Sequence, residues 1–177
     1  MPRLADLALP DPIEEGTGLW GHWAAENVRR GGLVLLGSEE AAEGFAQAGY
    51  EVWQLAVPDG SSGLERASAV LSAVLSGLEG PLFLVGHGAA GAWVWALARA
   101  GSGLTAAAVF GSFLPDTDPP DLPIVLHLDD TGLDAEIEAL QTRLPDLRVH
   151  RLSAGADLAR LRTLAVFSRA TGRGEGA

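Results

Sequence analysis

The chain has 177 residues, 47% of them hydrophobic, and carries 12 basic against 23 acidic side chains for a formal net charge of −11. A chain of this length can form one domain with its own core, without a disulfide or metal to hold it. It contains no cysteine and no lysine, which excludes a disulfide scaffold, a cysteine nucleophile and Schiff-base chemistry. The negative charge argues against nucleic acids and anionic membranes as partners.

We therefore expect a single domain over residues 1–177. Its first segment, 1–30, has no clear pattern beyond 18–24, which fits either an edge strand or the start of a helix, and the tail at 171–177 is expected to be flexible. The N-terminus lacks the apolar run of a signal peptide. No stretch approaches the ~20 apolar residues of a membrane span, so we expect a cytoplasmic protein.

Short apolar runs alternate with longer helix-like segments along the rest of the chain. Most of these runs are nearly continuous, which is typical of strands covered on both faces. The predicted strands are 33–36, 52–57, 82–85, 106–110, 124–128 and 147–152. The predicted helices are 39–48, 62–78, 89–100, 133–144 and 157–169. This alternation predicts an α/β fold, a three-layer, doubly wound and mostly parallel sheet of about six strands.

The most informative segment is the turn after the third of these strands, Gly86-His87-Gly88-Ala89-Ala90-Gly91. It matches the dinucleotide-binding pattern G-x-G-x-x-G, whose small residues let a pyrophosphate approach a helix N-terminus. That pattern usually opens the first βα unit and is followed about 20 residues later by an acidic residue. In this chain two βα units precede it, and no acidic residue ends the next strand. Dinucleotide binding is therefore the third of our hypotheses.

The same turn resembles the nucleophile elbow of the α/β-hydrolase superfamily, and its surroundings resemble the dienelactone-hydrolase-like group. The hexapeptide is similar to the superfamily's Gly-His-Ser-x-Gly-Gly. Residues 45–52 and 57–60 resemble the helix, strand and loop upstream of the elbow, and 106–111 and 122–127 resemble the next two strands. The resemblance implies a minimal α/β-hydrolase fold without a cap domain. It also implies a site built from a nucleophile, an acid and a histidine.

This chain departs from the family at the residues that carry the chemistry. Gly88 occupies the position of the family's Ser or Cys nucleophile. The acid would follow the fifth core strand, where Asp129 or Asp130 stands, with Asp134 as a further candidate. An ordinary turn or N-cap role explains these aspartates equally well. Asp157 occupies the position of the histidine, and it also suits the N-cap of the last helix.

Open parallel sheets bind ligands at the carboxyl ends of their strands. The residues expected to line a small-molecule pocket there are Gly37, Ser38, His87, Gly88, Ala89 and Asp129. Ser38 stands where the family places an oxyanion-hole donor, although helix N-capping is the simpler role. The four histidines show no metal-ligand spacing, so we expect no metal and no cofactor. Two of them, His127 and His150, fall within predicted strands as core or edge residues.

These observations favour an α/β-hydrolase-fold protein that has lost Ser or Cys hydrolase chemistry. We expect it to act as a small-ligand-binding or interaction protein, with neither nucleic acid nor membrane as a partner. The alternative is an ester hydrolase with a displaced nucleophile, for which the candidates are Ser38, Ser61 and Ser112.

Overall fold

The computed structural model describes residues 19–23, 30–36, 40–55, 62–77, 80–101, 103–129, 134–152 and 155–172. Most of the N-terminal segment and of the tail expected at 171–177 lies outside these ranges, as do Gly37, Ser38, Ser61 and Asp130. The described chain falls into two compact units, Met1–Val85 and Gly86–Ala177, and each is described by itself. The single domain over residues 1–177 stays a prediction.

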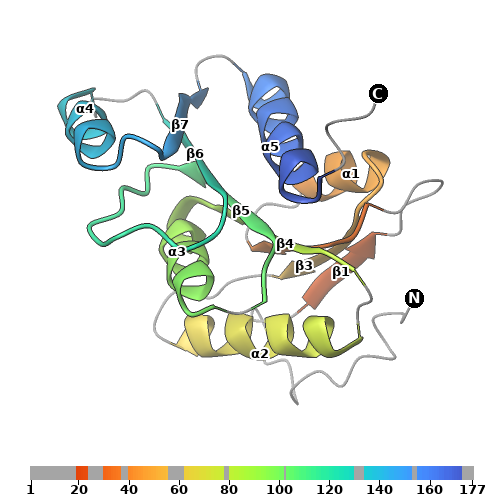
Figure 1. The fold of residues 1–177 in the computed structure, drawn as a ribbon. Coiled ribbons are helices and arrows are strands. Elements are labelled where there is room, and N and C mark those ends of the chain that lie inside the picture. The colour runs from red at the N-terminus through yellow and green to blue at the C-terminus, as the bar shows by residue number, and fades with distance from the viewer. Residues whose placement is uncertain are drawn as a thin grey trace. The chain divides into compact units, whose positions relative to one another are not determined.

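Strands and helices alternate in both units, as the sequence predicts (Figure 1). The first unit holds β1 (Leu19–Trp23), β2 (Gly32–Leu36), α1 (Glu40–Gln47), β3 (Glu51–Leu55) and α2 (Ser62–Gly77). Strand β4 (Leu82–His87) begins in the first unit and ends in the second. The second unit continues with η2 (Gly88–Ala90), α3 (Gly91–Arg99), β5 (Ala106–Gly111), β6 (Ile124–Leu128), α4 (Asp134–Arg143), β7 (Arg148–Arg151) and α5 (Ala156–Ala170).

The strands follow the order β1-β3-β2-β4-β5-β6-β7 in a mostly parallel sheet. Strand β3 is parallel to β2, and β6 is parallel to both β5 and β7. Strand β1 pairs antiparallel with β3 at the edge, so the ambiguous segment at 18–24 forms an edge strand rather than a helix start. The predicted α/β sheet with its six core strands is confirmed.

In the first unit the strands carry the core. Strands β2 and β3 are buried along their whole length, which explains the nearly continuous apolar runs in the sequence. The ring of Phe83, near the start of β4, packs edge-on against Tyr50 with 5.4 Å between the ring centroids. Helices α1 and α2 lie on opposite faces of these strands (Figure 1). The unit therefore has the expected order of helix, sheet and helix.

In the second unit α3 and α5 pack against β5 from opposite faces, and α5 also contacts β6 (Figure 1). Helix α3 buries Val94 and Trp95, and α5 buries Val166 and Phe167.

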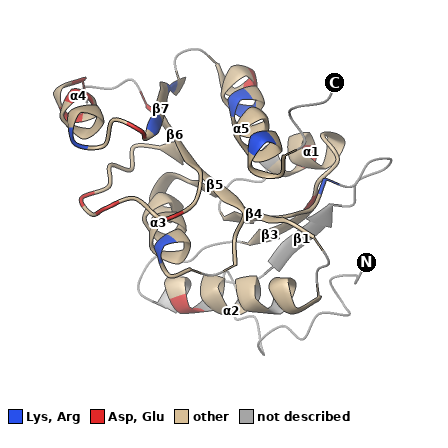
Figure 2. Cartoon of the chain, in the orientation of Figure 1, with Lys and Arg blue, Asp and Glu red and all other residues tan. Residues whose placement is uncertain are grey.

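Figure 2 shows basic residues on β7 and α5 and acidic residues in the loop that precedes β6. None of the helices within the described ranges is long and apolar enough to cross a membrane.

Candidate functional site

The predicted elbow forms a strand, a tight turn and a helix. Strand β4 ends at His87 with extended backbone, a 3-10 turn covers Gly88–Ala90, and α3 begins at Gly91. Gly88 has a φ of +60°, in the left-handed region that L-residues rarely adopt. An α/β hydrolase presents its nucleophile on a strained turn of this kind. Gly88 presents only backbone, and a Cβ built on it meets no heavy atom within 4 Å.

Packing accounts for the other two glycines of the G-x-G-x-x-G pattern. A Cβ at Gly86 would lie 2.5 Å from Cγ2 of Val94, and one at Gly91 would lie 2.7 Å from Cγ1 of Val109. Both distances are too short for real side chains, so the close approach of α3 to the strands requires glycine at these positions. The turn therefore needs no bound pyrophosphate to explain its glycines.

The candidate acid, Asp129, follows β6 and is held at the carboxyl ends of two neighbouring strands. Its backbone N–H donates to the carbonyl of Gly111 at 3.0 Å, and its Oδ2 accepts a 3.0 Å hydrogen bond from the hydroxyl of Ser112. Gly111 in turn approaches Gly88 so closely that a Cβ on it would lie 3.1 Å from the Gly88 nitrogen. Ser112 is the next residue after Gly111, so the Ser112–Asp129 hydrogen bond forms beside the residue that contacts the elbow.

Asp134, the further candidate for the acid, and Asp157, at the position of the histidine, have partners elsewhere. Asp134 begins α4 and forms an ion pair with Arg151. Asp157 lies in the first turn of α5, where its exposed carboxylate pairs with Arg160 at 3.1 Å. The expectation that Asp157 caps this helix is wrong. The N-cap is Gly155, at φ +98° and ψ +148°, a conformation that glycine adopts without strain.

Sequence reasoning missed a stack of four rings that crosses the second unit, formed by His87, Phe110, His127 and His150. Successive ring centroids lie 4.7, 4.6 and 5.5 Å apart, with interplanar angles of 11°, 28° and 25°. The stack follows the strand register, which pairs Phe110 with His127 and His127 with His150. The signal in the sequence was an aromatic or imidazole ring near the end of each strand, and only the strand order brings these rings together.

The three imidazoles of the ring stack all have lowered pKa values. His127 is fully buried, and burial, followed by the charges of His150, Arg162 and His87, lowers its pKa from 6.5 to about 3. Burial also lowers the pKa of His87. The pKa of His150 is lowered by burial and then by the charges of Arg162 and Arg148. Among the described residues, neither Nε2 of His87 nor Nδ1 of His127 has a hydrogen-bond partner.

Of the residues predicted to line a ligand pocket, the described part of the chain contains four. Gly88 and Ala89 are exposed, and His87 and Asp129 are half-buried. His87 and Gly88 are sequence neighbours in the elbow. Gly88 lies close to Gly111, which precedes Ser112 of the Ser112–Asp129 pair. A ligand at this edge stays a prediction. The described residues hold no group of three or more His, Asp or Glu side chains arranged for a metal ion.

Comparison with known proteins identifies the fold of this chain. No protein-family model and no curated protein matches the chain. The solved structures that it resembles include TT1662 from Thermus thermophilus, at a TM-score of 0.61 and 19% identity, with 91% of this chain and 98% of that chain covered. Another is the esterase Est2 from Thermogutta terrifontis, at 0.58 and 14%, with 96% and 99% covered.

A third similar structure is a protein assigned as a dienelactone hydrolase from Klebsiella pneumoniae, at a TM-score of 0.56 and 14% identity, with 81% of this chain and 89% of that chain covered. These likenesses show that the chain has the α/β-hydrolase fold, in agreement with the resemblance seen in the sequence. Since one fold hosts many activities, the activity has to be argued from the site.

Proposed function

We propose that this α/β-hydrolase-fold protein lacks Ser or Cys hydrolase activity and acts by binding a small ligand or a partner. The observation that carries the proposal is Gly88 at the elbow, with a φ of +60° and no side chain. Covalent hydrolysis in this fold requires a nucleophile at that point to form the acyl intermediate. A glycine supplies no attacking atom.

The missing histidine supports the same proposal. In a catalytic triad an imidazole stands between the carboxylate and the hydroxyl, takes the proton from the hydroxyl and later returns it. In this chain the hydroxyl of Ser112 donates directly to Asp129, with no imidazole between them. The histidine of the elbow itself, His87, has its ring stacked on Phe110. The carboxylate of Asp157 is engaged by Arg160.

A fluorophosphonate probe and short-chain aryl esters test the proposal. We expect no covalent labelling and no ester hydrolysis above the rate of heat-denatured protein, because Gly88 supplies no nucleophile at the elbow. Labelling of the wild-type chain, or turnover that an active-site substitution abolishes, would contradict the proposal. A purified serine esterase, labelled in parallel, controls for the activity of the probe.

The Ser112–Asp129 hydrogen bond is the one observation that favours the alternative, an ester hydrolase with a displaced nucleophile. That alternative predicts that Ser112→Ala removes hydrolysis and labelling while thermal stability stays unchanged. Ser72→Ala is the matched control, because it removes an exposed serine of α2 in the first unit that belongs to none of the proposed sites. If the two variants and the wild type are equally inactive, the alternative fails.

A further inference from the structure

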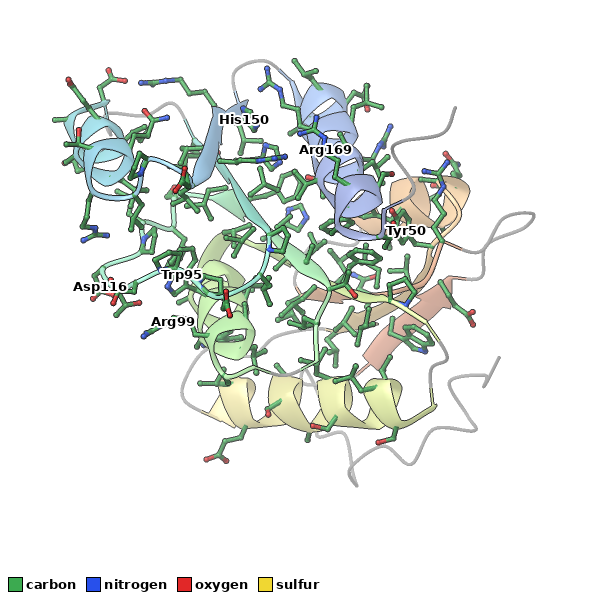
Figure 3. All side chains as sticks on the ribbon, in the orientation of Figure 1. Tyr50, Trp95, Arg99, Asp116, His150 and Arg169 are labelled. Carbon is green, nitrogen blue, oxygen red and sulfur yellow. The ribbon has the colours of Figure 1, made fainter. Side chains whose placement is uncertain are left out.

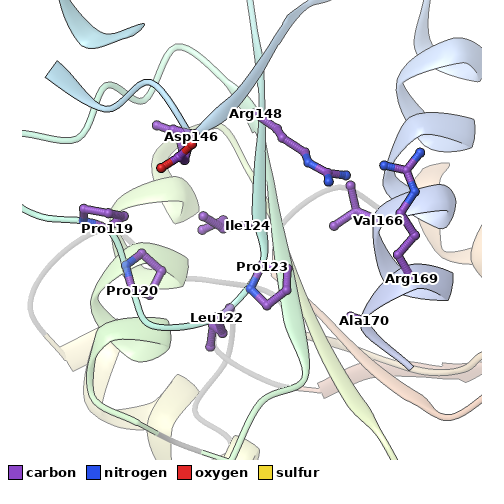
Figure 4. A pocket seen from close by; sticks show the side chains of 11 residues that line it. Pro119, Pro120, Leu122, Pro123, Ile124, Asp146, Arg148, Val166, Arg169 and Ala170 are labelled. Atoms are coloured by element: carbon purple, nitrogen blue, oxygen red, sulfur yellow. The ribbon is translucent and has the colours of Figure 1, made fainter. Parts of the chain in front are cut away.

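A pocket of about 400 Å³ lies in the second unit, at the end of β6 opposite to Asp129 (Figure 4). The loop before β6 supplies Pro119, Pro120 and Leu122, β6 supplies Ile124, and α5 supplies Val166. The volume falls in the range of small-molecule sites, and most of the lining is apolar, as such sites usually are. The pocket shares no residue with the elbow or with the Ser112–Asp129 pair.

Two arginines provide the pocket's positive charge. Arg148 comes from the start of β7 and Arg169 from the last turn of α5; Figure 3 labels Arg169 on its helix. Figure 4 shows the two side chains extending toward each other beside Val166. The third charged residue of the lining, Asp146, lies on the Pro119 side of the pocket (Figure 4).

Neither of these guanidinium groups forms an ion pair or a hydrogen bond within the described part of the chain. The ion pairs found there join Arg151 to Asp134 and Arg160 to Asp157, and neither Arg148 nor Arg169 is in one. The whole chain has nearly twice as many acidic as basic side chains. Two arginines that line one pocket and have no carboxylate partner among the described residues are therefore notable in this protein. A pair of guanidinium groups matches an external carboxylate in charge and in geometry.

We infer that this pocket binds a small organic carboxylate that carries an apolar group. The apolar group would lie against the prolines and Ile124, and the carboxylate would lie between Arg148 and Arg169. Each half of the pocket recognises one half of such a ligand, so an inorganic anion or a neutral apolar molecule meets only part of the site. The inference goes beyond the proposed function, because it concerns the opposite end of β6 and does not depend on the elbow.

Calorimetric titration of the full chain with 4-phenylbutyrate tests this inference. We expect saturable binding with a Kd of about 1 mM or tighter. The neutral analogue 4-phenylbutanamide and inorganic phosphate should each bind at least about tenfold more weakly, because each lacks one of the two recognised parts. Methyl resonances of Ile124 and Val166 should shift during the titration, which places the ligand in this pocket.

Arginine variants distinguish binding in the pocket from a general effect of the protein's net charge. Arg148→Gln and Arg169→Gln should each weaken 4-phenylbutyrate binding about tenfold or more. Arg160→Gln removes the same charge from α5 outside the pocket and should leave binding unchanged. All three arginines lie at the surface or partly so, and thermal melts verify that each variant is folded. If one pocket variant does not fold, the other still decides.

Three results would overturn the inference. The first is failure of 4-phenylbutyrate to saturate the protein at millimolar concentration. The second is equal affinity for the acid and its amide, which would show that the arginines do not recognise the charge. The third is an equal loss of affinity in Arg160→Gln and in the pocket variants, which would show only an effect of net charge.

Discussion

The Nε2 atom of His127 and the hydroxyl of Thr163 lie 2.9 Å apart in the core of the second unit. Thr163 donates its own proton to the carbonyl of Ala159 at 3.0 Å, so its oxygen accepts from His127. The imidazole therefore carries its single proton on Nε2, and Nδ1 is left as a buried acceptor. A second proton on this ring would have no acceptor among the described residues, which agrees with the lowered pKa.

Replacement of Thr163 by Val keeps the volume but removes the acceptor. We expect the free energy of unfolding to fall by about 1–3 kcal/mol, because the Nε2–H of His127 is then buried without a partner. Thr163→Ser is the matched control, since it keeps the hydroxyl and should retain most of the stability. Urea denaturation above neutral pH measures both. A Thr163→Val protein as stable as the Ser variant would contradict the hydrogen bond.

Stability should decrease in acid because of His127. Its pKa is about 3 in the folded protein, against 6.5 as the ordinary value expected of the unfolded chain. Between these values the unfolded state binds a proton that the folded state does not. The contribution of His127 is therefore fully present above about pH 6.5 and is lost as the pH falls toward 3, by about 1.4 kcal/mol for each pH unit. Urea denaturation across this range measures the slope.

His127→Phe tests the origin of that slope. Phenylalanine cannot titrate, and it can stack between Phe110 and His150 as the imidazole does, so the slope should become shallower. A residual slope is expected from His87 and His150, whose pKa values burial also lowers. His150→Phe, at the partly exposed end of the ring stack, should change the slope less. If both variants change it equally, His127 is not the main source.

The glycines of the elbow should differ in their tolerance of a methyl group. Gly88→Ala places a Cβ in open space and should cost only the left-handed conformation, about 1–2 kcal/mol. Gly86→Ala adds a clash with Val94 and with the backbone at Ala90, so the loss of unfolding free energy should be greater. Denaturant midpoints compare the two variants. The reverse order would show that the packing of Val94 and Ala90 against Gly86 is looser than these distances imply.

A double substitution tests the alignment with hydrolases. Gly88→Ser restores a nucleophile where a Cβ has room, and Asp157→His restores a histidine at the position aligned with the family. We expect the double variant, but neither single one, to react with a fluorophosphonate and to hydrolyse aryl acetates. Asp129→Asn in that background should lower the rate. Labelling of the double variant alone would confirm the placement of Asp157, and equal labelling of Gly88→Ser by itself would contradict it.

Local patterns were enough to predict the sheet and the elbow. Strands β2 to β6 are short apolar runs next to glycine or proline, and a strand buried on both faces leaves such a run in the sequence. Strand β7 is polar, with exposed ends. The absence of a nucleophile is equally local, because Gly88 is fixed within the motif by its neighbours Gly86 and Gly91. These features depend on residues that are close in sequence, and the structure confirms the strand, turn and helix of the elbow.

Features that depend on strand neighbours could not be predicted. The ring stack joins His87 to His150 through strands separated by up to sixty residues, and its existence follows from register. The pocket brings Arg148 and Arg169 together only because α5 packs back against the sheet. The cap of α5 was mispredicted because Asp157 has the more common capping side chain, whereas the backbone conformation there selects Gly155.

Strand β7 places Arg148 and His150 two residues apart, so both side chains belong to the same face. After burial and Arg162, the charge of Arg148 is the third influence that lowers the pKa of His150. An anion bound to Arg148 would offset that charge and raise the pKa of His150. Thermodynamic reciprocity then requires acid to tighten the binding of the anion. One short edge strand would thus link ligand occupancy to proton uptake. The affinity for the ionised carboxylate should therefore increase as the pH falls, over the range in which the fold persists and the ligand keeps its charge.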